Sequence, residues 1–97
     1  MENNHHFDLI KGTFSAEECR EVILGLINYK IGFHEKKSFS SEIRTGKPDT
    51  FSIARIKELK AIRDGLVRAF AEAERENAEL SVTSSVSIEA LAREAVS

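Results

Sequence analysis

The residue pattern between Phe51 and Asn77 constrains the fold more than any other part of the chain. Apolar side chains recur there at spacings of three and four, which is the period of one face of an α-helix. Charged residues recur every fourth position on the opposite side and alternate in sign, as on a solvated helix face. The apolar positions are Ile53, Ile56, Leu59, Ile62, Leu66, Phe70 and Ala73, and the charged ones are Lys60, Asp64, Arg68 and Glu72. The pattern predicts a helix of about seven turns whose apolar side needs a partner.

Two arginines interrupt the apolar side of this predicted helix. On a helical wheel Arg63 falls between Ile56 and Phe70, and Arg55 lies beside Leu66. We expect their aliphatic stems to pack while the guanidinium groups reach water or a carboxylate on a neighbouring element. The alternative is an anion site or an ion pair between subunits.

Composition and length favour a small helix-rich protein. The 97 residues predict one domain over residues 7–97, preceded by a polar tail over residues 1–6. The single Pro, the five Gly and the 41% apolar content argue against disorder. Cys19 has no second cysteine to pair with, and the first six residues lack the basic and apolar segments of a signal peptide. No apolar segment reaches the roughly 18 residues that span a bilayer, so we expect a cytoplasmic protein.

The chain before the long helix predicts a strand and a first helix. Residues Phe7–Phe14 alternate in the manner of a short strand. Ser15 followed by Glu18 forms a capping box, which predicts that a helix starts at Ala16. We expect this helix to fade between Phe33 and Phe39.

Turn and capping residues fill the stretch Ser38–Asp49, so the sequence predicts a connection of about a dozen residues, closed by a Gly-Lys-Pro-Asp turn. The turn ends at Asp49 or Thr50, either of which can cap the long helix. After that helix the apolar period changes from 3.6 to 2, which predicts a strand from Leu80 with Ser84 on its apolar side. Residues 88–96 fit either the end of this strand or a short C-terminal helix.

These elements predict an α+β fold that is predominantly α, with the order β-α-α-β. The two helices form an antiparallel hairpin with a short strand at each end. If both strands emerge at the open end of the hairpin, they can pair with one another. Because an isolated two-stranded sheet is marginally stable, we expect a homodimer that joins strands or packs the hairpins in a coiled-coil-like four-helix arrangement.

Charge is distributed unevenly along the chain. Residues 30–63 carry nine Lys and Arg against four Asp and Glu, a balance of +5, while residues 1–29 and 64–97 have balances of −3 and −4. A hairpin would therefore be positive at its tip and negative at its open end. The candidate binding residues are Lys36, Lys37, Arg44, Lys47, Arg55 and Arg63.

Two function classes use these cations. The favoured hypothesis is a dimeric protein-interaction or regulatory module that presents its basic tip to an acidic protein. The alternative is nucleic-acid binding, because Phe33, Phe39 and Phe51 lie among the basic residues and could stack on bases. A pI near 5.9 argues against the alternative. We expect the phenylalanines to close the end of the core.

Enzyme and metal motifs are incomplete in this sequence. His34-Glu35 begins like an HExxH zinc helix, but Ser38 occupies the second histidine position. Gly46-Lys47 lacks the first glycine and the Ser/Thr of a phosphate-binding loop. His5, His6 and His34 have no accompanying metal-ligand motif. We therefore predict no catalytic residues, no metal and no cofactor.

Three segments carry a resemblance to known proteins. With residues 7–18 (Phe-Asp-Leu-Ile-Lys-Gly-Thr-Phe-Ser-Ala-Glu-Glu), 39–44 and 46–49, the chain resembles small uncharacterised bacterial proteins with the same order of helices. The resemblance implies a bacterial, cytoplasmic origin. It implies no activity and no site residue.

Overall fold

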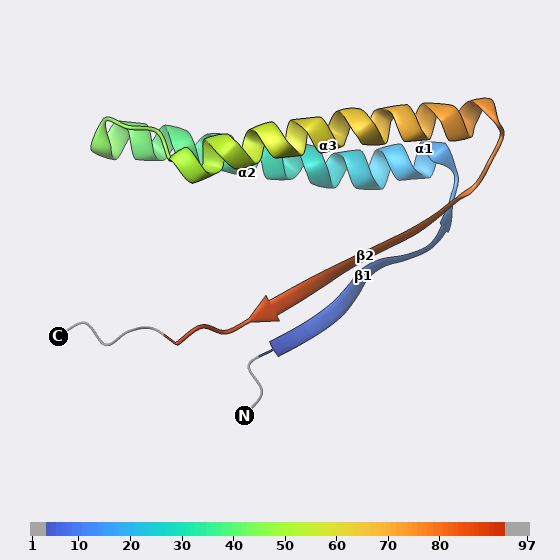
Figure 1. Ribbon diagram of the computed structural model, residues 1–97, viewed down its shortest axis with the longest axis horizontal. Helices are drawn as coiled ribbons and strands as arrows, with labels where there is room; N and C mark the ends of the chain where they lie inside the picture. The colour runs from blue at the N-terminus through green and yellow to red at the C-terminus, as the bar shows by residue number, and fades with distance from the viewer. Residues whose placement is uncertain (1–3, 93–97) are drawn as a thin grey trace. The chain divides into compact units, whose positions relative to one another are not determined.

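The computed structural model describes residues 4–92 of the chain and confirms the predicted β-α-α-β order (Figure 1). One continuous helical run of 30 residues precedes a helix of 26 residues, and the two strands pair antiparallel. The elements are β1 (Asn4–Phe14), α1 (Ala16–Cys19), the π-helical turn η1 (Arg20–Leu24), α2 (Gly25–Thr45), α3 (Thr50–Arg75) and β2 (Leu80–Glu89).

The chain divides into two compact units. The single domain expected over residues 7–97 stays a prediction. One unit contains β1 up to Thr13 and β2 from Ser81, and the other is the helical unit, Phe14–Leu80. Each has its own backbone hydrogen-bond pattern, one a two-stranded ladder and the other a helical hairpin.

The strands are longer than predicted at their outer ends. β1 begins at Asn4, so His5 and His6 belong to the strand and not to a polar tail. Pairing with β2 supplies backbone hydrogen bonds that the polarity of these side chains does not reveal. β2 ends at Glu89 and no helix follows it as far as residue 92; the rest of the predicted alternative, residues 93–96, lies outside the described residues. Ser84 is half-buried, in phase with Val82 and Val86 as predicted.

The first helix begins where its capping box predicts. The Ser15 hydroxyl accepts a hydrogen bond from the Glu18 N–H at 3.1 Å, and the Glu18 carboxylate accepts one from the Ser15 N–H at 2.9 Å. The helix axis then passes through the π-helical turn η1. Inward positions follow one another here at Cys19, Ile23, Ile27 and Ile31, three consecutive steps of four residues. A wider turn keeps these steps on one side, because an ideal α-helix would let them drift by about 40° per step.

The predicted long connection is wrong, because α2 continues to Thr45 and only four residues, 46–49, separate it from α3. Serine lowers helix propensity by only about 0.5 kcal/mol per residue. Ser38 and Ser41 are half-buried inward positions, so packing along the hairpin compensates for this. The helix ends at Gly46, which adopts φ +79°, a left-handed conformation that glycine accepts without strain.

The core of the helical unit is narrow. Its buried side chains come from one line along each helix, and Leu59, Cys19 and Ser52 are the most deeply buried. Ile53 and Ile62, which the sequence pattern places on the inward side of α3, are 48% and 45% exposed. The buried residues are Ala16, Cys19, Ile31, His34, Ser52, Leu59, Phe70 and Ala73.

An ion pair joins the two helices at the open end of the hairpin. Arg20 Nη2 lies 2.6 Å from Glu74 Oε2. The hydrogen bond from Arg20, with the charge of its guanidinium, holds the pKa of Glu74 below its ordinary value. The carboxylate thus has a lower pKa folded than unfolded. Its stabilising effect is full above the unfolded pKa and is lost as the pH falls through the folded pKa.

We therefore predict that Glu74→Gln lowers the stability of the protein at pH 7 and makes little difference in strong acid. The measurement is the urea midpoint of wild type and variant between pH 7 and pH 2. Glu79→Gln, which removes an exposed carboxylate that has no cationic partner within 4.0 Å among residues 4–92, serves as the control. A difference between Glu74→Gln and wild type that stays constant across this range would contradict the ion-pair explanation.

Candidate functional site

Four of the six predicted cations gather at the closed end of the hairpin. Lys36, Lys37 and Arg44 lie on the last turns of α2, and Lys47 lies in the connection to α3; all four are exposed. In the part of the chain that the structure describes, none of the four has a carboxylate oxygen within 4.0 Å. Their charge is therefore available to a partner.

The connection that carries Lys47 is held by side-chain hydrogen bonds. The Lys47 carbonyl oxygen accepts a hydrogen bond from the Ser41 hydroxyl at 3.0 Å. The Thr45 hydroxyl donates its one proton to the Ser41 carbonyl oxygen at 2.7 Å and accepts from the Lys47 N–H at 3.2 Å, while its oxygen lies 3.1 Å from the Lys47 carbonyl oxygen. These bonds order the turn, so the tip is a defined surface.

The other two predicted cations, Arg55 and Arg63, each have a side-chain partner within the helical unit. Arg55 Nη1 lies 2.7 Å from Glu58 Oε2, one turn along α3. Arg63 Nη1 donates to Asn28 Oδ1 on α2 at 3.0 Å. Arg63 is thus held by an amide of the neighbouring helix and lies well away from the tip. The candidate site therefore consists of Lys36, Lys37, Arg44 and Lys47, and it includes neither Arg55 nor Arg63.

The expectation that the phenylalanines close the core is wrong. Phe33, Phe39 and Phe51 are 51%, 64% and 67% exposed. The core at this level is closed by His34 and Ser52 instead, and the rings of Phe33 and Phe51 contact His34 edge-on at centroid distances of 5.2 and 6.4 Å. Phe39 has an exposed apolar neighbour one turn on, Ile43, which is 69% exposed.

A buried hydrogen-bonded chain of three side chains underlies the tip. The Ser52 hydroxyl donates to Asp49 Oδ2 at 2.7 Å, and His34 Nδ1 lies 3.1 Å from the same Ser52 oxygen. Because the single hydroxyl proton goes to Asp49, His34 must donate from Nδ1. Hydrogen bonding from Ser52, with the charge of Lys37 contributing less, lowers the pKa of Asp49.

This chain has the residue types of a hydrolase triad in an order that does not suit catalysis. A nucleophilic serine gives its proton to histidine, whereas Ser52 gives its proton to Asp49 and accepts one from His34. The arrangement instead ties α2 to the start of α3. Sequence reasoning missed it, although Asp49 and Ser52 have the spacing of a helix cap and its third residue.

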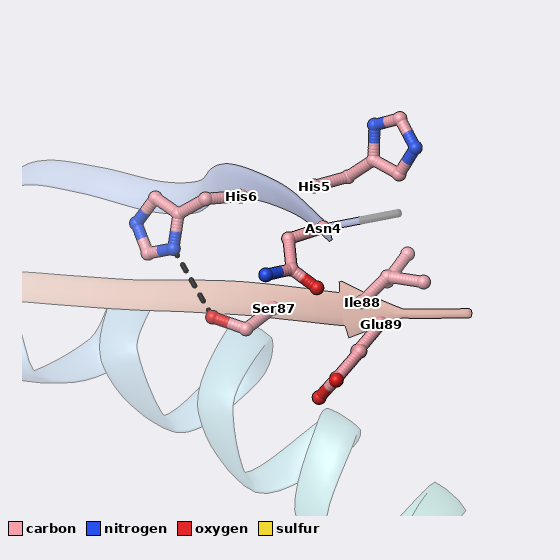
Figure 2. A pocket seen from close by; sticks show the side chains of 6 residues that line it. All are labelled: Asn4, His5, His6, Ser87, Ile88 and Glu89. Carbon is pink, nitrogen blue, oxygen red and sulfur yellow. Dashed lines mark hydrogen bonds between the residues drawn. The ribbon is translucent and has the colours of Figure 1, made fainter. Parts of the chain in front are cut away.

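The histidines of β1 lie in a hollow of the strand unit, of about 360 Å³, lined by Asn4, His5, His6, Ser87, Ile88 and Glu89. Figure 2 shows His6 turned toward Ser87, with its Nδ1 3.1 Å from the hydroxyl, while His5 points away from it. Nε2 of His6 lies 3.8 Å from Asp8 Oδ1. Over residues 4–92, no three His, Cys, Asp or Glu side chains are grouped to hold a metal ion.

Cys19 is almost completely buried, and this burial, with the charge of Glu18 as a smaller cause, raises the pKa of its thiol. A raised pKa lowers the thiolate fraction at neutral pH, so the residue has the properties of a packing side chain.

Comparison with known protein families, with curated proteins and with solved structures finds no match for this chain. The resemblance to small bacterial hairpin proteins therefore stays a prediction. Within the residues that the structure describes, α2 and α3 are too polar for either to cross a bilayer.

Proposed function

We propose that this protein is a homodimeric binding module that presents its hairpin tip to an acidic protein. The observation that carries the proposal is the combination of charge and apolar surface there. The exposed side chains of Phe39 and Ile43 lie one turn apart, among cations that have no carboxylate partner within residues 4–92. We call Lys36, Phe39, Ile43 and Lys47 the tip surface.

Interfaces between proteins combine apolar anchors that become buried with charged residues at the rim. The tip surface has both, on a turn that is already ordered by hydrogen bonds. The cations would steer an acidic partner to the tip, and burial of Phe39 and Ile43 would hold it there. Phe39 and Ile43 are 64% and 69% exposed, and neighbouring exposed apolar side chains rimmed by charged residues are typical of interaction sites.

Self-association is the second part of the proposal. It is supported by the two-stranded sheet, which has no third strand within the described residues, and by the many apolar side chains exposed on the helical unit. Isolated two-stranded sheets and uncovered apolar faces are both weakly stable in water.

The test uses fluorescent peptides that contain several Glu residues and two apolar residues one helical turn apart, and a single-stranded oligonucleotide as the competing probe. We expect peptide binding to weaken about tenfold for Phe39→Ser and for Lys36→Ala combined with Lys47→Ala, as measured by fluorescence anisotropy. Val67→Ser, which removes an exposed apolar side chain from α3 outside the tip surface, should leave binding unchanged.

The salt dependence separates the two partner classes. Binding of nucleic acid through phosphates falls steeply with salt and is insensitive to Phe39→Ser unless bases stack on that ring. If the oligonucleotide binds more tightly than every peptide and is released by salt, the nucleic-acid alternative replaces the proposal.

A further inference from the structure

We infer that a second copy of the chain covers one face of the helical hairpin and packs on it antiparallel, with the tip of each copy against the open end of the other. The inference rests on the homodimer of the proposed function. It assigns the surface that the two copies share and the antiparallel direction in which they pack. We call this surface the central apolar face. It consists of Val22, Leu26, Tyr29, Phe33, Ile62, Gly65 and Ala69.

The first row of this face runs along η1 and α2. Val22, Leu26, Tyr29 and Phe33 follow one another at spacings of four, three and four residues, which is the pattern of a helix that packs against another helix. Their exposed fractions are 46%, 41%, 75% and 51%. The row is therefore distinct from the buried line through Ile31 and His34, and nothing within the helical unit covers it.

The second row runs along α3 on the same side of the hairpin. Phe33 and Phe51 both contact the ring of His34, so they mark one side. Ile62 and Ala69 follow Phe51 by 11 and 18 residues, which is about three and five whole helical turns. They therefore lie on the same side of α3 as Phe51, nearer to the open end of the hairpin. Gly65 lies between them, and a Cβ atom added there would meet open space.

Charge changes sign along both rows. On α2 the apolar row continues toward the tip as Lys37 and Arg44, four and eleven residues after Phe33. Toward the open end it continues as Glu72 on α3 and Glu76, the C-cap residue of that helix, three and seven residues after Ala69. All four of these side chains are exposed. The face is basic at one end, apolar in the middle and acidic at the other.

The two ends of the helical unit are charged equally and oppositely. Residues 30–63 have the balance of +5, and residues 14–29 with 64–80 hold three Lys and Arg against eight Asp and Glu, a balance of −5. The apolar row Val22–Phe33 lies near the middle of the Ala16–Thr45 helical run. A twofold axis there would superpose the apolar rows and place each basic end on an acidic end.

The antiparallel sense follows from these charges. In a parallel pair the two basic tips would face one another, as would the two acidic ends, and like charges in contact oppose association. The antiparallel pair forms four helices around a shared apolar centre, an arrangement in which helices joined by short connections are stable.

The first test compares two substitutions on α3 by sedimentation over a range of protein concentrations. Ile62 and Val67 are 45% and 44% exposed, but five residues place them about 140° apart around the helix. We expect Ile62→Glu to weaken the dimer at least about a hundredfold, because it places a charge in each half of a buried apolar centre. Val67→Glu should leave the dimer unchanged. Circular dichroism checks that both variants remain helical.

The second test reverses the charges at one end or at both. Lys37→Glu with Arg44→Glu, or Glu72→Lys with Glu76→Lys, should each weaken the dimer about tenfold. The four substitutions together in one chain should restore it, because tip and open end are then again opposite in sign.

Each result bears on a separate claim. Wild-type protein that sediments as a monomer at every concentration overturns the homodimer and this inference with it. A monomer is the result expected if the strand unit, and not a second copy, covers the central apolar face. A dimer that Ile62→Glu leaves intact overturns this inference alone and directs attention to the strands. A dimer that is lost in Ile62→Glu but unaffected by either pair of charge reversals overturns the antiparallel sense.

Discussion

Phe70→Ala is expected to lower the free energy of unfolding by about 3–5 kcal/mol, the range for removing a buried phenylalanine ring. Phe70 is 4% exposed and is the only aromatic side chain buried among the described residues apart from the imidazole of His34. Small domains have total stabilities of about 5–15 kcal/mol, and this core is narrow. The loss would therefore be a large fraction of the whole. The measurement is urea unfolding followed by circular dichroism at one protein concentration, since association changes apparent stability.

Phe39→Ala is the matched control, because it removes the same ring from a site that is 64% exposed. Its effect on stability should stay within about 0.5 kcal/mol, as for most surface substitutions. If both variants lose the same stability, the distinction between the core and the tip surface is wrong.

Local signals in the sequence predicted the elements well. Ser15 and Glu18 act through neighbouring backbone groups, so they marked the start of the first helix without knowledge of the fold. Asp49 is the N-cap residue of α3, as predicted, although its carboxylate accepts from the Ser52 hydroxyl and not from a backbone N–H. The period-2 pattern after Leu80 is the strand β2. Each of these features is decided within a few residues.

The sequence predictions that were wrong concern features that depend on packing between the helices. The serines between Ser38 and Ser41 have the composition of a loop, but contact with α3 keeps them helical up to the left-handed Gly46. Exposure was misjudged for Ile53 and Ile62, because the sequence does not reveal how narrow a strip of each helix the partner covers. The charge asymmetry was predicted from sequence. The hydrogen bond from Arg63 to Asn28, which removes Arg63 from the candidate site, depends on the register of α2 against α3 and was not predicted.

Ser52→Ala is the second substitution with a large expected effect. Ser52 is fully buried, and its hydroxyl accepts from His34 Nδ1 and donates to Asp49. Alanine is the better helix former by about 0.5 kcal/mol, so propensity alone predicts a gain. We instead expect a loss of about 1–3 kcal/mol, because the buried Nδ1–H of His34 would have no acceptor. Urea unfolding measures the difference, with Ser40→Ala on the exposed side of α2 as the control for propensity.

A double substitution separates the hydrogen bond from simple packing. Replacing both partners of a buried hydrogen bond by apolar groups removes the unpaired donor that a single replacement leaves behind. His34→Phe with Ser52→Ala should therefore be more stable than the sum of the two single changes predicts, by about 1 kcal/mol or more. Strictly additive losses would mean that His34 and Ser52 contribute independently, as packing residues. A positive coupling would show that the Asp49–Ser52–His34 chain holds α2 against the start of α3 and so fixes the shape of the tip on which the proposed binding depends.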